Sequence, residues 1–269
     1  MNEIYSNKDA SSNNHEIQEK FNYIISRFIL IGDISISTRN DTATLWLVES
    51  VYTIFSNIQD KDRKRQYFVD SLEQISEFIE HCAKNELEKA TISGITGIYN
   101  IYDITSDTLS RAVILRALIN IGKISSEMKL ERSTIEAITY IGLLIDMDLS
   151  IKNRMEITRK SLTAIGFIAL NSAENKLEAP CEKALLLISK FSIETINQRT
   201  ENTIDSAIDI IGKITIPCII NGFKDCVNLT IESYQILKKN IKKEGSRLEL
   251  IEKIEGWELR IQEKKKEQY

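Results

Sequence analysis

A short apolar phrase built around a small residue recurs between residues 117 and 214. Its copies begin at Ala117, Ala137, Ser161, Ala184 and Ala207, and four of them read Ile-Gly at the centre, whereas Ser189 replaces the glycine in the fourth copy. The small residues stand 20, 24, 23 and 23 residues apart, so that two steps make a unit of 44 to 47 residues. A repeat of this length predicts stacked pairs of helices.

The small residue at the centre of each phrase needs a packing reason. Glycine inside a helix costs about 1 kcal/mol relative to alanine. A small residue lets a neighbouring helix approach closely, while the surrounding isoleucine and leucine side chains fill the grooves beside it. We therefore expect the recurring small residues to mark contacts between stacked helices.

The phrase resembles part of a known repeat family. The segments 115–124 and 159–168 carry the arginine, the small residue and the Leu/Ile-Gly pair of the second helix of HEAT repeats, and the resemblance covers roughly residues 90–216. This chain departs from the family by carrying the phrase on successive helices and by lacking the family's proline and aspartate in the first helix and turn. The resemblance implies an all-α fold, a right-handed α-solenoid of antiparallel helix pairs of the HEAT or armadillo kind, with a compact multi-helix bundle as the alternative.

The rest of the chain also reads as helices. Only two prolines and ten glycines occur, too few for the frequent turns of an all-β fold. Apolar residues at helical spacing predict a helix over 16–31, with Ile17, Phe21, Ile24 and Phe28 on one face and Gly32 as its C-cap, and further helices over 41–59, 66–83 and 224–243. Pro217 is expected to end or kink the helix that contains it.

These elements suggest four segments. Residues 1–15 are expected to be a disordered tail, 16–85 to form N-terminal helices packing on the array, 86–245 to form the helical-repeat array, and 246–269 to form an amphipathic capping helix with a basic tail. In this last helix Leu250, Ile254, Trp257 and Ile261 form an apolar stripe, which we expect to cap the core. Pairing of the stripe with a second chain, and hence a homo-oligomer, is the alternative.

Composition and chemistry point away from several classes of protein. The chain has 42% hydrophobic and 28% charged residues, as in ordinary folded proteins. It lacks an apolar run long enough for a membrane span and a leader-like N-terminus, so a cytoplasmic location is expected. The four cysteines follow no metal-ligand spacing, and we expect reduced, mostly buried thiols.

No catalytic, cofactor-binding or metal-binding residues emerge from the sequence. Nucleophilic catalysis requires a base beside the nucleophile, yet the only histidines are His15 and His81. His81 and Cys82 are adjacent on a predicted helix, so their side chains diverge by about 100°. Glu77 and His81 share a helical face but lack further ligands. The chain is therefore not expected to be an enzyme or to need a cofactor.

The function that remains is binding through the protein surface. We expect a non-enzymatic protein–protein interaction or scaffold module that uses a concave repeat surface to bind a protein or peptide. A nucleic-acid-binding protein is a less favoured alternative, because the net charge is −4 and the basic residues concentrate at Lys61, Arg63, Lys64 and Arg65 and in the C-terminal segment 238–269. An unrecognised helical enzyme is a further alternative. An acidic ridge of Asp70, Glu73, Glu77 and Glu80 reads as a solvated face, with docking of a basic partner as the alternative.

Overall fold

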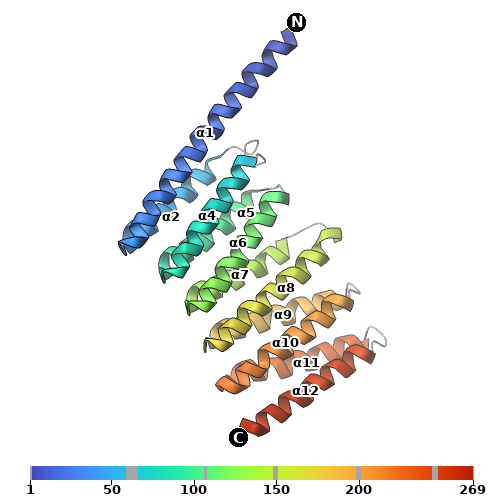
Figure 1. The fold of residues 1–269 in the computed structure, drawn as a ribbon. Helices are drawn as coiled ribbons and strands as arrows, with labels where there is room; N and C mark the ends of the chain where they lie inside the picture. Colours follow the sequence, from blue (N-terminus) through green and yellow to red (C-terminus); the bar gives the residue numbers. More distant parts are fainter. Residues whose placement is uncertain are drawn as a thin grey trace. The chain divides into compact units, whose positions relative to one another are not determined.

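A computed structural model of the chain describes residues 2–58, 66–105, 108–147, 151–197, 201–243 and 248–268. These segments are helical and contain no strand (Figure 1). The helices are α1 (Asn2–Ser37), α2 (Asp41–Ser56), α4 (Gln66–Lys84), α5 (Glu88–Ile104), α6 (Thr108–Glu127), α7 (Glu131–Met147), α8 (Ile151–Glu174), α9 (Glu178–Asn197), α10 (Glu201–Asn221), α11 (Lys224–Lys243) and α12 (Leu248–Gln268). The prediction of an all-α fold is confirmed.

The chain divides into two compact units, Met1–Ile121 and Gly122–Tyr269, and the division falls inside α6. In the first unit α1 packs on α2 and α4, and α5 packs on α2 and α4. The part of α6 that belongs to this unit reaches α4 through an ion pair between Arg116 and Glu73. The first unit is thus built from two layers, with α1 and α4 in one and α2 and α5 in the other (Figure 1).

The second unit repeats this two-layer plan. Helices α8, α10 and α12 form one layer and α7, α9 and α11 the other (Figure 1). Each helix here contacts the next helix in the chain and the next but one. Contacts limited to near neighbours are typical of helical repeats, whereas a compact bundle brings together helices that are distant in sequence. The unit is therefore a helical repeat, while the handedness and the HEAT or armadillo subtype stay predictions.

Tight turns join the two helices of each pair. A residue with a left-handed backbone stands in each turn, namely Arg39 (φ 51°), Glu86 (φ 60°), Lys129 (φ 60°), Lys176 (φ 63°) and Gly222 (φ 75°). In the turn at Lys176, the Leu177 amide donates to the Ser172 carbonyl at 2.8 Å, which is the six-to-one bond of a Schellman cap. Leu87, Leu130 and Phe223 make the same bond in their turns, and all four apolar side chains are buried. The turns therefore repeat as regularly as the helices.

The small residues of the recurring phrase lie where helices of the same layer meet. A Cβ atom added at Gly142 would lie 2.9 Å from Leu187 Cδ1, and one at Gly166 would lie 2.5 Å from Ile210 Cγ2. These distances are shorter than the 3.5–4.0 Å or so at which carbon atoms pack. The side chain that fills each gap comes from the helix one repeat further along. The prediction that these residues permit close stacking is confirmed.

Several predicted boundaries were wrong. Helix α1 begins at Asn2, where a disordered tail over 1–15 was expected, and it continues past Gly32 to Ser37. Gly32 is not a cap, because the Phe78 ring packs against it. Helix α10 runs through Pro217 to Asn221, so the proline does not end it. The segments 16–85, 86–245 and 246–269 stay a prediction.

The described helices do not include one that combines the length and the apolar composition needed to cross a membrane.

Candidate functional site

The most exposed apolar surface of the first unit lies on α1. Tyr23, Ile24, Leu30, Ile31 and Ile34 are each at least 42% exposed, and we call these residues the outer face of α1. At 100° per residue they fall within one third of the helix circumference. Exposed apolar residues are usually scattered singly, whereas a stripe of them on one helix indicates a contact surface.

Packing within the first unit explains why this face is open. The opposite side of α1 buries Ile25 and accepts the Phe78 ring of α4 at Gly32, while Ser35 hydrogen-bonds to Thr44 of α2 at 2.7 Å. Helix α1 is the outermost helix of its layer in this unit. The stripe predicted from Phe21, Ile24 and Phe28 was therefore partly wrong, because Ile24 faces solvent and Ile25 is the buried residue.

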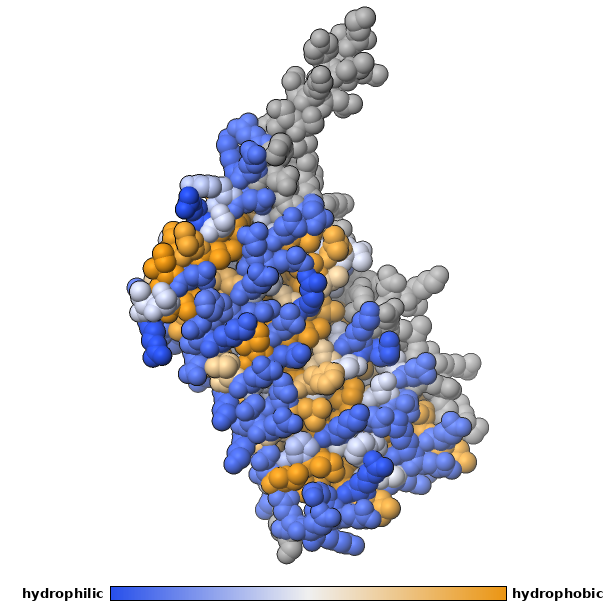
Figure 2. All heavy atoms as spheres, in the orientation of Figure 1, coloured by the Kyte–Doolittle hydropathy of each residue, from blue (hydrophilic) through white to orange (hydrophobic). Residues whose placement is uncertain are grey.

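A further exposed apolar side chain stands on α2. Trp46 is 62% exposed, although tryptophan usually hides most of its surface. Figure 2 shows apolar side chains gathered at the end of the unit where α1 and α2 meet. The open surface therefore continues from α1 onto α2, and it offers large apolar side chains to a partner.

The end of the second unit is built differently. The stripe of Leu250, Ile254 and Ile261 on α12 is buried, and Trp257 packs its ring against Gly212 of α10. The solvent side of α12 carries mainly charged residues, among them Glu249, Glu252, Glu255, Arg260 and Glu263. A polar outer face is the usual finish of a helical repeat. The stripe thus caps its own unit.

The contact between α10 and α12 is reinforced by polar bonds. Lys253 pairs with Asp205 and Asp209 at 2.7 Å each, and the Trp257 indole donates to Asp209 at 3.0 Å. Although burial opposes it, the hydrogen bonds from Lys253 and Trp257 hold the pKa of Asp209 below its ordinary value. Burial lowers the pKa of Lys253, but the hydrogen bonds to Asp205 and Asp209 outweigh it and hold this pKa above its ordinary value.

The acidic ridge of α4 faces solvent beside two hollows of the first unit. One hollow, of about 490 Å³, is lined by Glu73, Glu77 and Glu80 of α4 and by Arg116 of α6. The other, of about 380 Å³, lies between α1 and α4. Arg116 pairs with Glu73, and the Gln66 amide donates to Asp70 at 2.8 Å. Neighbouring side chains thus engage part of the ridge.

The histidine of α4 is tied to α1. His81 Nδ1 lies 2.9 Å from Asp33 Oδ1, and Glu77 lines the same hollow. Cys82 points the other way, into the core, and burial raises its pKa to about 12. His81 and Cys82 are therefore not brought together as a base and a nucleophile. The side chain of His15 and the basic residues Lys61, Arg63, Lys64 and Arg65 lie outside what the structure describes.

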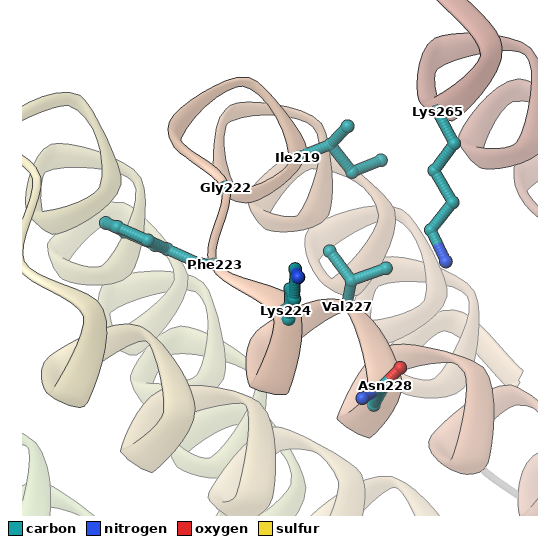
Figure 3. A pocket seen from close by; sticks show the side chains of 7 residues that line it. All are labelled: Ile219, Gly222, Phe223, Lys224, Val227, Asn228 and Lys265. Atoms are coloured by element: carbon teal, nitrogen blue, oxygen red, sulfur yellow. The ribbon is translucent and has the colours of Figure 1, made fainter. Parts of the chain in front are cut away.

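The basic tail borders a small hollow in the second unit. Lys265 extends over Ile219 and Val227, with Lys224 and Asn228 on the other side, and the hollow measures about 280 Å³ (Figure 3). Lys264 pairs with Glu267 at 2.7 Å. The floor of this hollow is apolar, which suits neither nucleic-acid backbones nor a small anion.

The cysteines give a result that their spacing does not predict. All four thiols are free and buried, as expected. Cys181, Cys218 and Cys226 nevertheless come near one another in the second unit. The signal that could have found them is the repeat itself, because helices one repeat apart, such as α9 and α11, stack side by side. Residues 45 to 48 apart are therefore neighbours.

Comparison with known proteins supports the fold and leaves the activity open. No protein-family model matches the sequence, and no curated protein matches it either. A solved structure described as the DHF46 filament aligns with a TM-score of 0.50 and 13% identity, over 64% of this chain and 97% of that chain. A chain from a study titled "Computational Design of Self-Assembling Cyclic Protein Homooligomers" aligns with a TM-score of 0.42 and 15% identity, over 97% and 96%. The first likeness agrees with an all-α helical-repeat fold.

Proposed function

We propose that the chain is a non-enzymatic interaction or scaffold module that binds a partner protein through the outer face of α1. The observation that carries the proposal is the row of exposed apolar side chains on this helix. Burying apolar surface contributes about 25 cal/mol per Å², so five such side chains are a substantial source of binding energy. The buried apolar stripe of α12 shows that the same fold can finish without such a surface.

The chemistry of the surface indicates the kind of partner. Its apolar residues recur at steps that match one face of a helix, as in the faces by which α4, α8 and α10 stack on their neighbours. An amphipathic helix laid along α1 would continue the layer and bury the stripe. Arg27 lies in the middle of this face and stacks 4.9 Å from the Tyr23 ring centroid, so a positive charge stands among the apolar side chains. A helical partner with an acidic flank suits this arrangement.

The HEAT or armadillo resemblance agrees with a binding role but adds no partner. The DHF46 filament shares the fold at 13% identity, and its name speaks of that protein's assembly. The expected concave surface stays a second prediction within the same function. Neither a nucleic-acid-binding role nor an enzymatic one gains a supporting contact among the described residues.

A pull-down from host lysate with matched variants tests the proposal. We expect wild-type bait to retain a protein that survives nuclease treatment, and Ile31→Glu to lose it, because a charge would enter the apolar surface. Leu186→Glu on α9 is the control, since both side chains are 53% exposed in the free chain. Light scattering of the purified chain separates a partner from a second copy. Equal capture by Ile31→Glu and the wild type, or recovery of nucleic acid alone, would contradict the proposal.

A further inference from the structure

Three side chains with metal-binding atoms meet at the beginnings of α9 and α11. One carboxylate oxygen of Glu178, one of Glu182 and the Cys226 sulfur all lie within 4.8 Å of one another. Glu178 and Glu182 are one helical turn apart on α9, so their carboxylates point to the same side. Cys226 comes from the first turn of α11, which packs against α9. Two neighbouring helices of one layer thus contribute to one cluster.

The cluster extends inward through two more thiols. Cys181, on the same turn of α9, and Cys218 of α10 lie near Cys226. All three sulfurs are fully buried, whereas the two glutamates are only partly so. The cluster therefore has soft sulfur atoms on its inner side and hard carboxylate oxygens on its outer side, where an ion could enter from solvent.

The negative charges of the cluster favour a bound cation. Glu178 and Glu182 lie at the start of α9, and Asp225 precedes Cys226 in the first turn of α11. Ionised carboxylates this close together repel one another. A bound divalent cation removes this repulsion, because it stands between the carboxylates and takes the place of the thiol proton.

We propose that Glu178, Glu182 and Cys226 bind a divalent cation of the zinc class, and that this ion ties α9 to α11. A thiolate selects soft and borderline cations over Mg²⁺ and Ca²⁺, and carboxylate oxygens complete zinc sites in proteins. Zn²⁺ binds sulfur at about 2.3 Å and carboxylate oxygen at about 2.0–2.2 Å, which makes the edges of a tetrahedral site roughly 3.5 Å long. The three ligand atoms now lie up to 4.8 Å apart, and rotation of the side chains can shorten these distances to the edges of a tetrahedral site.

Two further thiols lie near the three ligand atoms. Cys181 Sγ lies 3.1 Å from the Leu177 carbonyl oxygen and 3.3 Å from that of Ala169, so it is held by the backbone. Cys218 and Cys181 both border Cys226. Neither sulfur belongs to the group of ligand atoms within 4.8 Å of one another, so either would have to move closer to complete the tetrahedron.

Titration of the full-length reduced chain with Cd²⁺ tests the site, because cadmium–thiolate bonds absorb in the near ultraviolet. We expect one Cd²⁺ per chain, displaced by Zn²⁺ and not by Mg²⁺. Cys226→Ser should abolish the absorption. Glu182→Gln, on a partly exposed side chain that leaves the core intact, should weaken Cd²⁺ binding about tenfold or more. Cys82→Ser, which changes the buried thiol of the first unit, is the control and should bind as the wild type does.

Several outcomes would overturn the proposal. One is a wild-type chain that shows no saturable cadmium–thiolate absorption. Another is absorption that disappears equally in Cys82→Ser. A third is Glu182→Gln binding as tightly as the wild type, which would mean that the carboxylates do not hold the ion. Far-ultraviolet circular dichroism of each variant shows that it is folded, and a rise in the unfolding temperature with Zn²⁺ is expected for the wild type but not for Glu182→Gln.

Discussion

Replacing Gly212 with alanine should destabilise the second unit, although alanine is the better helix former. The new Cβ would lie 2.6 Å from Trp257 Cε2 and closer still to Cδ2. Carbon atoms pack at about 3.5–4.0 Å, so the ring must retreat by roughly 1 Å. The indole also donates to Asp209 at 3.0 Å, and a retreat of that size lengthens this bond.

The expected size follows from three contributions. Overpacking costs about 1–3 kcal/mol. Weakening the partly exposed hydrogen bond costs about 1 kcal/mol. The helix propensity of alanine returns about 1 kcal/mol. The net loss in the free energy of unfolding is therefore about 1–3 kcal/mol.

Gly256 on α12 provides the matched control, because an added Cβ there meets nothing within 4 Å. Gly256→Ala should gain about 0.5–1 kcal/mol from helix propensity alone. Denaturant unfolding followed by circular dichroism compares the two variants. Tryptophan fluorescence adds a local signal, because the only other tryptophan, Trp46, is largely exposed. If Gly212→Ala is as stable as Gly256→Ala, the argument from close stacking is refuted.

Two further predictions concern the polar contact of α12 and the turns. The pKa of Asp209 lies below its ordinary value of 3.8, so the carboxylate stabilises the fold fully above that pH and loses its effect as the pH falls through the folded-state pKa. When the free energy of unfolding is measured across acid pH, Asp209→Asn should weaken its dependence on pH in this range. An unchanged pH dependence would refute the role of the carboxylate. Lys176→Gly should stabilise the second unit, because a left-handed backbone costs a non-glycine residue about 1 kcal/mol or more. Gly222→Ala should destabilise the unit for the same reason. Equal unfolding midpoints for the two variants would contradict this prediction.

Much of the fold could be predicted because apolar periodicity is local. The helix predicted over 66–83 forms as α4, and its apolar residues Phe68, Leu72, Ile75 and Ile79 are all buried. The Ile-Gly phrase also predicted close stacking, since few other roles suit glycine inside a helix. The turns could not be predicted by composition, because Arg39, Glu86, Lys129 and Lys176 adopt the conformation that glycine usually takes.

The sites were harder to predict because they depend on packing between helices. Ile24 and Ile25 are adjacent and equally apolar, and only the position of α4 decides which one is buried. The thiols of Cys181 and Cys226 are 45 residues apart and match no ligand motif. They meet because stacked helices repeat at about that interval. A search for metal ligands in a helical repeat should therefore include offsets of one repeat.

The contacts between near neighbours also shape how the second unit folds. Its side-chain hydrogen bonds include pairs of residues 48 or 49 apart, as between Trp257 and Asp209 or between Asn175 and Ser126. No step in assembling these helices requires the closure of a much longer loop, and loop closure is a main cause of slow folding. Folding can therefore start at any adjacent pair and spread in both directions. Under a pulling force, the same helices should detach pair by pair in several small steps.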